Sequence, residues 1–112
     1  IGVGLVGSEM CIRDRNSIRT HNMDIDITGD YNNVFHTQAG DADKTSTLTI
    51  NNDNNAVEHV QTGNGYHTST ITLGGTGATT FTGLQGGNSS RTYTLNQSCV
   101  NTNGCTVTVT QQ

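Results

Sequence analysis

Two cysteines near the carboxyl end are the residues with the clearest chemical potential. Cys99 and Cys105 lie in the segment SCVNTNGCTV, separated by five residues that include the turn pair Asn-Gly. Two thiols at this spacing can form a disulfide that closes the turn, remain as free thiols, or contribute to a zinc site. The zinc signal is weak because no pair of histidines stands beside them. A third cysteine, Cys11, stands far away in the segment LVGSEMCIRDR.

Two of the four histidines recur at a fixed distance along the chain. His36 and His59 are 23 positions apart and occupy matching places in two similar segments. An inward-facing pair of imidazoles could act as a pH switch, because two protonated rings repel each other below about pH 6. The pair could also bridge a metal ion, or form a neutral, hydrogen-bonded stack. We interpret His21 and His67 as turn residues.

Threonine and aspartate form two further sets that could bind a surface or an ion. The T-x-T pairs resemble the ranks of an ice-binding face, although threonine is also the best polar strand former. The aspartates cluster within residues 23–45 and could bind calcium. The sequence contains none of the glycine-rich nonapeptides of calcium-binding solenoids, so we expect a solvated acidic face. The two sets are Thr47, Thr49, Thr70, Thr72, Thr92, Thr94, Thr106 and Thr108, and Asp24, Asp26, Asp30, Asp41 and Asp43.

No arrangement of residues typical of catalysis is recognisable. The sequence has no phosphate-binding loop, no paired carboxylates suited to a cleft, and no Ser, His and Asp that strands would bring together. We therefore expect the chain not to be an enzyme and to need no cofactor or metal ion. The formal net charge of -4 argues against binding to nucleic acid or to an anionic membrane surface. No stretch is long and apolar enough to insert into a bilayer.

The composition is unusual for one small domain. Hydrophobic residues make up 30% of the 112 residues and charged residues 12%, with no proline and no tryptophan. So little apolar content is typical of disorder, but disordered chains usually contain proline and a high density of charge. The many β-branched residues, interrupted by glycine and asparagine, instead favour short strands joined by tight turns.

Internal repeats are the strongest signal in the sequence. Residues 23–45 align without a gap with residues 46–68 at a period of 23, and residues 69–91 and 92–112 continue the pattern with small changes. Each unit holds two runs of alternating polarity joined by a turn, which indicates strand, turn and strand. One unit cannot bury its inner face alone, so the units must stack. The sequence therefore predicts an all-β fold, a β-solenoid of about four strand-turn-strand rungs with short, parallel, stacked strands.

Alternation selects the side chains that face the inside of this solenoid. Equivalent residues of successive rungs lie about 4.8 Å apart. In-register glutamines, and Asn32 with Asn55, are expected to form amide ladders that supplement a narrow apolar stripe. In the last unit Gln97 aligns with Gly75, and the enlarged turn between the cysteines is a plausible cap. The inward set is Ile25, Ile27, Val34, His36, Gln38, Leu48, Ile50, Val57, His59, Gln61, Ile71, Leu73, Phe81, Gln85, Tyr93, Leu95, Val107 and Val109.

Residues 23–112 resemble the curlin repeat, which alternates two strands around a Gly/Asn turn and closes on a glutamine. The segment STLTINNDNNAVEHVQTGNG carries the resemblance best, with Ser46, Asn55 and Gln61 at the expected places. The chain departs from the curlin pattern at the first-strand glutamine, in its shorter turn, and in the two cysteines of its last unit.

The resemblance implies a secreted structural subunit of a functional amyloid, outside or on the surface of a Gram-negative bacterium. Such subunits stack rung on rung into extracellular fibres for biofilm or adhesion. The implied partners are further copies of the chain, a nucleator subunit and an outer-membrane secretion pore. Export to an oxidising compartment favours a disulfide between Cys99 and Cys105. The alternative function is a monomeric secreted β-solenoid that acts as a binding module, either an adhesin or an ice-binding protein.

Residues 1–15 differ in texture from the rest and do not fit the repeat. The segment over residues 5–15 back-translates to a DNA sequence that resembles a transposon-end adapter used in sequencing libraries. This resemblance implies a truncated gene assembled from environmental reads, with the native start and any signal peptide upstream. Residues 1–15 are then non-native and disordered, and residues 16–22 are the remnant of a preceding unit. Without Cys11, the chain retains an even pair of cysteines.

Overall fold

The computed structural model describes residues 2–4, 9–14 and 21–112, and every regular element in this part of the chain is a β-strand. The alternating polarity of the sequence explains this, because a strand sends successive side chains to opposite faces. The strands are β1 (Gly2–Gly4), β2 (Glu9–Asp14), β3 (His21–Ile27), β4 (Asn33–Gln38), β5 (Lys44–Ile50), β6 (Ala56–Gln61), β7 (His67–Gly75), β8 (Thr79–Gln85), β9 (Arg91–Cys99) and β10 (Cys105–Gln111).

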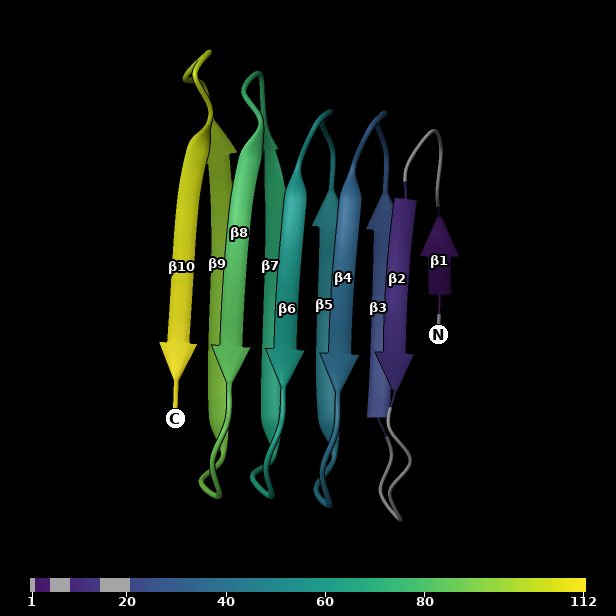
Figure 1. The fold of residues 1–112 in the computed structure, drawn as a ribbon, viewed down its shortest axis with the longest axis vertical. Helices are drawn as coiled ribbons and strands as arrows, with labels where there is room; N and C mark the ends of the chain where they lie inside the picture. Colours follow the sequence, from purple (N-terminus) through teal and green to yellow (C-terminus); the bar gives the residue numbers. More distant parts are fainter. Residues whose placement is uncertain (1, 5–8, 15–20) are drawn as a thin grey trace.

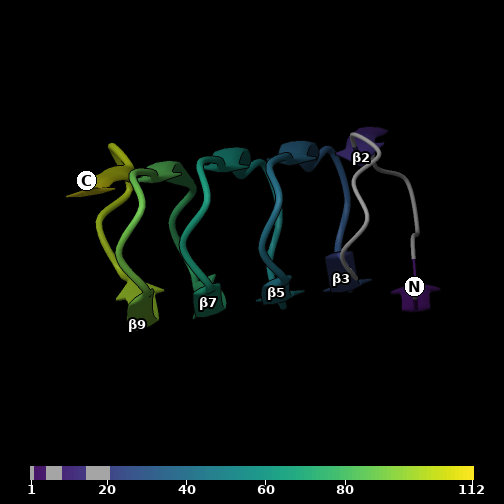
Figure 2. The ribbon, with the colours of Figure 1, turned by 90° about the horizontal axis from the view of Figure 1, so that it is seen from below.

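The strands form two parallel sheets that face each other. One sheet has the order β1-β3-β5-β7-β9 and the other the order β10-β8-β6-β4-β2, so each coil of the chain contributes one strand to each sheet (Figure 1). Figure 2, which looks along the strands, shows the two layers and the arcs that connect them. The predicted β-solenoid of about four turns is therefore confirmed.

Successive coils are in register at the spacing that the repeats predict. His21 pairs with Lys44 and Lys44 with His67, each 23 positions apart, whereas His67 pairs with Arg91, 24 positions away. The additional residue lies before Phe81, as the sequence alignment indicates. The strands β3, β5 and β7 each begin two residues earlier than the predicted units.

The core is a single layer of side chains between the two sheets. The predicted inward residues of the first three units are at most 4% exposed, and their apolar members form one continuous cluster. Tyr93, Leu95, Val107 and Val109 pack against this cluster but are only half-buried. They belong to the last coil, which has a neighbouring coil on one side only in the described part of the chain.

The last coil differs from its predicted register by two residues. The sequence alignment places Gln97 opposite Gly75, but Gln97 pairs with Leu73, and Cys99 pairs with Gly75. A shift of two residues keeps every side chain on its original face of the sheet, so the alternation of polarity cannot detect it. The predicted inward face of β9 is therefore unchanged, while its partners in β7 are different.

Two of the described strands lie within residues 1–15, the segment that is expected from the sequence to be non-native and disordered. β1 pairs in parallel with β3, and β2 with β4, where Met10 lies opposite Val34 at a distance of 24 positions. Matching the segment to the repeat at a spacing of 23 residues misses this pairing. Parallel pairing uses only backbone N–H and C=O groups, and every residue except proline supplies both. The rest of this segment and most of the remnant over 16–22 lie outside the described residues. The adapter-like origin of the segment stays a prediction.

The arcs between the strands stack as closely as the strands themselves. Gly40, Gly63 and Gly87 follow one another in the stack, and each has a positive φ, which glycine adopts without strain. A Cβ atom at Gly63 would lie 2.3 Å from the carbonyl oxygen of Gly87, so no larger residue fits there. The close approach of neighbouring arcs explains why these turns keep a glycine at the same place.

Candidate functional site

A ladder of glutamine side chains runs through the core along the stacking direction. The Nε2 of Gln38 donates to the Oε1 of Gln61 at 2.8 Å, and Gln61 donates to Gln85 at 2.7 Å, which confirms the predicted ladder. Gln85 donates in turn to the Oε1 of Gln111 at 2.9 Å. Gln111 is a fourth member of the ladder, which the sequence analysis missed although this glutamine closes the last repeat. Every amide donates towards the carboxyl end, so the ladder has a direction.

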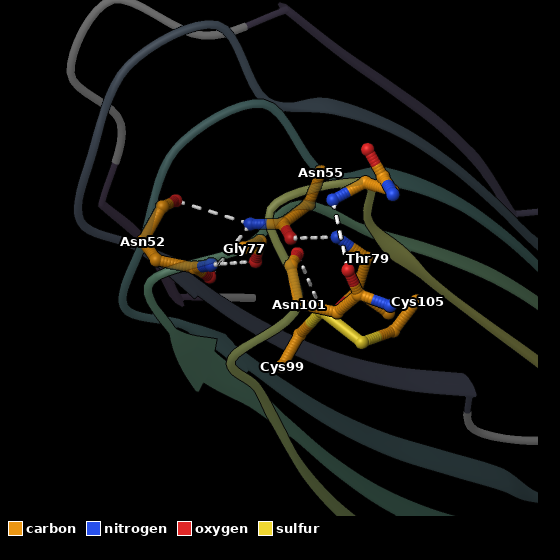
Figure 3. Close-up of a disulfide and its surroundings, with 8 residues drawn as sticks. Asn52, Asn55, Gly77, Thr79, Cys99, Asn101 and Cys105 are labelled. Atoms are coloured by element: carbon orange, nitrogen blue, oxygen red, sulfur yellow. Dashed lines mark hydrogen bonds between the residues drawn. A yellow bond between two sulfur atoms is a disulfide. The ribbon is translucent and has the colours of Figure 1, made fainter.

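The predicted asparagine ladder lies where the arcs enter the second sheet. Both the backbone N–H and the Nδ2 of Asn55 donate to the Oδ1 of Asn32, at 2.9 Å and 2.8 Å. The Oδ1 of Asn55 accepts from the backbone N–H of Thr79 at 2.8 Å (Figure 3). Thr79 pairs with Cys105 in the next coil, so this column of asparagines ends in a cysteine.

A disulfide joins Cys99 to Cys105 and closes the arc of the last coil. Its Cα atoms are 5.8 Å apart, and its two residues end β9 and begin β10 (Figure 3). Two backbone hydrogen bonds hold this arc against the arc of the preceding coil. The N–H of Gly77 donates to the carbonyl oxygen of Cys99 at 2.8 Å, and the N–H of Cys105 donates to the carbonyl oxygen of Ala78 at 2.9 Å. The disulfide therefore ties together two strands that each have one neighbour.

The two aligned histidines lie together in the centre of the core. His36 and His59 are fully buried, and the Nδ1 of His59 lies 3.2 Å from the Nε2 of His36. Burial lowers the pKa of His36 to about 4, and burial together with the neighbouring His36 lowers the pKa of His59 to about 3. Both imidazoles are therefore neutral at pH 7. Gly83 continues the column, and the ring of Tyr93 lies 5.9 Å from that of His59.

A buried lysine is the main polar feature that the sequence analysis missed. The side chain of Lys44 is 0% exposed, and its Nζ donates to the carbonyl oxygens of Ala42, Gly63 and Gly65 at 3.0, 3.0 and 2.9 Å. Burial lowers the pKa of this ammonium group, although nearby aspartates oppose the shift. The three hydrogen bonds fix two successive arcs to the start of β5.

Lys44 belongs to a column of basic residues that open the strands of one sheet. His21, Lys44, His67 and Arg91 follow one another in register, and their regular spacing is the signal that could have revealed the column. His21 and His67 are therefore strand residues, which corrects their interpretation as turn residues. The ring of His67 is buried, and its Nε2 lies 2.8 Å from the carbonyl oxygen of Thr62. Burial lowers the pKa of His67 as well.

Threonines cover the outer face of the sheet that contains β5, β7 and β9. They stand about 4.8 Å apart across the strands and about 6.6 Å apart along them. Asp24 and Asp26 end the array on β3, while Thr106 and Thr108 lie on β10 in the opposite sheet. The predicted aspartates are all exposed. The columns of the array are Thr45–Thr68–Thr92, Thr47–Thr70–Thr94 and Thr49–Thr72–Asn96.

The described residues contain no group of three or more His, Cys, Asp or Glu side chains that could hold a metal ion. They also contain no helix with the length and apolarity needed to cross a membrane. No family model, no curated protein and no solved structure matches this chain.

Proposed function

We propose that this protein is a structural subunit that stacks end to end, coil on coil, into an extracellular fibre of the curli type. The observation that carries the proposal is the state of the last coil. β9 and β10 each pair with one strand only within the described part of the chain, and their inward side chains are half-buried. A further coil of the same repeat would complete both sheets and bury these side chains.

The edge formed by the last coil lacks the usual protection against strand addition. Soluble proteins block exposed edges with charges, prolines or bulges. β10 reads CTVTVTQ and contains no charged residue and no proline, and Arg91 is the single charged residue of β9. An unprotected parallel edge on a solenoid favours the addition of another coil.

The glutamine ladder supports stacking in one orientation. At the amino-terminal side, the Oε1 of Gln38 is buried and accepts no hydrogen bond from any described residue. At the carboxyl side, the Nε2 of Gln111 donates one hydrogen bond, to the carbonyl oxygen of Thr92 at 3.5 Å. The ladder therefore has an acceptor at its amino end, where Gln38 lies in register with Asp14 of β2, and a donor at its carboxyl end, and this polarity favours stacking in a head-to-tail orientation.

Secretion and the partners of the fibre rest on the curlin resemblance. On that basis the chain leaves a Gram-negative bacterium through an outer-membrane pore, starts on a nucleator subunit and serves biofilm or adhesion as an extracellular fibre. The disulfide is consistent with an oxidising compartment outside the cytoplasm. The polymer itself needs no cofactor and no catalytic residue.

A matched pair of variants tests the proposal. Val109→Asp places a charge on the half-buried inner face of β10, and Thr70→Asp places the same charge on the exposed outer face of β7. We expect Val109→Asp to abolish seeded elongation, because a second coil would bury the charge, and Thr70→Asp to elongate at the wild-type rate. Equal elongation of the two variants would contradict stacking at this edge.

The threonine array favours a second candidate function, a monomeric module that binds a regular surface such as ice. In that case the molecule acts through the outer face of β5, β7 and β9, and Thr70→Asp is the damaging variant. The test is thermal hysteresis of a dilute, monomeric sample. Hysteresis that is lost in Thr70→Asp and kept in Val109→Asp would favour the surface-binding module over the fibre.

A further inference from the structure

The disulfide occupies the same two positions as a hydrogen-bonded pair of asparagines in an interior coil. In that coil the Nδ2 of Asn55 donates to the Oδ1 of Asn52 at 2.8 Å, across the arc between the two sheets (Figure 3). The register carries the Asn55 column through Thr79 to Cys105, and the Asn52 column through Gly75 to Cys99. The covalent bridge of the last coil therefore replaces an amide bridge.

The interior amide bridge depends on coils on both of its sides. The Nδ2 of Asn52 donates to the carbonyl of Gly77 in the following coil at 2.8 Å, and Asn55 donates to Asn32 in the preceding one at 2.8 Å. Asn55 also accepts the N–H of Thr79 from the following coil. In the last coil water would replace the two partners that a following coil supplies, and a hydrogen bond that competes with water contributes little. A disulfide holds the arc closed with no following coil.

The closed arc fixes the geometry of the two edge strands at the growing end. β10 is hydrogen-bonded to β8 alone, and the arc 100–104 returns the chain from one sheet to the other. The sulfur of Cys99 packs close to the Gly77 backbone, where an added Cβ would lie 2.9 Å away. Opening the bridge would free the arc and allow β10 to fray, because a terminal strand has no second neighbour.

We propose that Cys99 and Cys105 form a thiol–disulfide switch that sets whether this edge accepts a second copy of the chain. The proposal rests on the proposed function, since the partner is the chain itself. In the oxidised state the arc is closed and both edge strands are ordered. A dithiol reductant transfers two electrons and two protons to the disulfide, which yields two cysteine thiols and a cyclic disulfide of the reductant. The edge then loses its order and stacking slows.

The first test is hydrogen exchange on the monomeric full chain, in a Cys11→Ser background that removes the third thiol. We expect the backbone amides of β10 to exchange roughly 10- to 100-fold faster after reduction with dithiothreitol, because the seven-residue loop is no longer closed. Amides of β5 and β6 serve as the internal control and should be unchanged. A Cys99→Ser, Cys105→Ser double variant should match the reduced protein with or without dithiothreitol. Equal exchange of β10 in the two redox states would overturn the switch.

The second test is seeded elongation with the same oxidised and reduced samples. We expect reduction to slow elongation several-fold and reoxidation to restore it, while the serine variant stays slow throughout. Equal rates, or faster elongation after reduction, would overturn the switch and leave the proposed fibre standing. Absence of elongation in every sample would contradict the proposed function, and the hydrogen exchange result would then decide the redox control of β10 order by itself.

Discussion

At the scale of single residues, buried polar side chains hold this narrow core together, and each depends on a partner in a neighbouring coil. Gln61 bonds to glutamines on both sides, and His36 lies against His59. Lys44 binds three backbone carbonyls of two arcs. Such groups are costly when a partner is lost, because a buried polar atom without a hydrogen bond retains its full desolvation penalty.

The histidine pair predicts a loss of stability in mild acid. The pKa values of His36 and His59 are lowered from 6.5 to about 4 and about 3, so below pH 6.5 the unfolded chain binds more protons than the folded one. Above pH 6.5 both imidazoles are neutral in the folded and the unfolded chain, and the protein has its full stability. As the pH falls from about 6 to 4, the free energy of unfolding decreases by about 3 kcal/mol per pH unit. Denaturant unfolding at several pH values measures the slope. A His36→Gln, His59→Gln double variant should flatten it, and an unchanged slope would contradict the assignment.

The buried lysine predicts a large effect from a change that removes only polar atoms. Lys44→Met keeps an apolar stem of similar size but removes the donor to three backbone carbonyl oxygens, of which those of Ala42 and Gly65 lie in buried hydrogen bonds. We expect a destabilisation of about 2–5 kcal/mol in denaturant unfolding. Thr45→Ala, at the exposed next position of β5, is the control and should change stability by less than about 0.5 kcal/mol. If Lys44→Met leaves the free energy of unfolding unchanged, water replaces the ammonium group as the donor to these carbonyl oxygens.

The polar residues differ in how well the sequence reveals them. The glutamine ladder and the histidine pair follow from the repeats because they sit inside clear alternating runs. Lys44 and His67 sit at the junction of turn and strand, where polar residues are expected to be exposed and the alternation has not yet begun. Their burial depends on the arcs that fold over them, and a sequence pattern does not contain that information.

At the scale of strands and arcs, alternation predicts which residues form strands and which face is buried, but it leaves the pairing of strands partly open. The two-residue shift of Gln97 in β9 keeps the buried face, so both registers fit the pattern equally well. The pairing of β2 with β4 escapes a period-based comparison because its spacing differs by one residue. The arcs are better defined, since their glycines recur with the repeat.

The arcs predict opposite outcomes for two glycine substitutions. Gly63→Ala places a Cβ 2.3 Å from the carbonyl oxygen of Gly87 and needs a φ of +84°, so we expect at least about 2 kcal/mol of destabilisation. Gly74→Ala, in β7, has no atom within 4 Å of the new Cβ and should be neutral or stabilising by less than about 1 kcal/mol. Thermal unfolding of both variants measures the difference. Similar melting temperatures would show that the arcs are not tightly stacked.

At the scale of the whole molecule, the two ends of the solenoid differ. β1, which has three residues, and β2, which has six, form the edge over β3 and β4, whereas the longer strands β9 and β10 form the edge at the other end. Deletion of residues 1–15 would uncover β3, β4 and the acceptor of Gln38. We therefore expect the shortened chain to form fibres with a shorter lag time than the full chain in a light-scattering assay. A longer or unchanged lag time would show that β1 and β2 do not slow fibre formation by covering β3 and β4.

The mass per length of the fibres tests coil-on-coil stacking most directly. Five strands in each sheet span roughly 24 Å along the stack, so a single filament should contain one 11.9 kDa subunit per roughly 24 Å. An ordinary amyloid, in which each chain forms one flat layer, would contain one subunit per roughly 4.8 Å and be about five times heavier. Dark-field electron microscopy of unstained fibres measures this quantity. We predict the lighter value, and the heavier value would contradict coil-on-coil stacking of the solenoid.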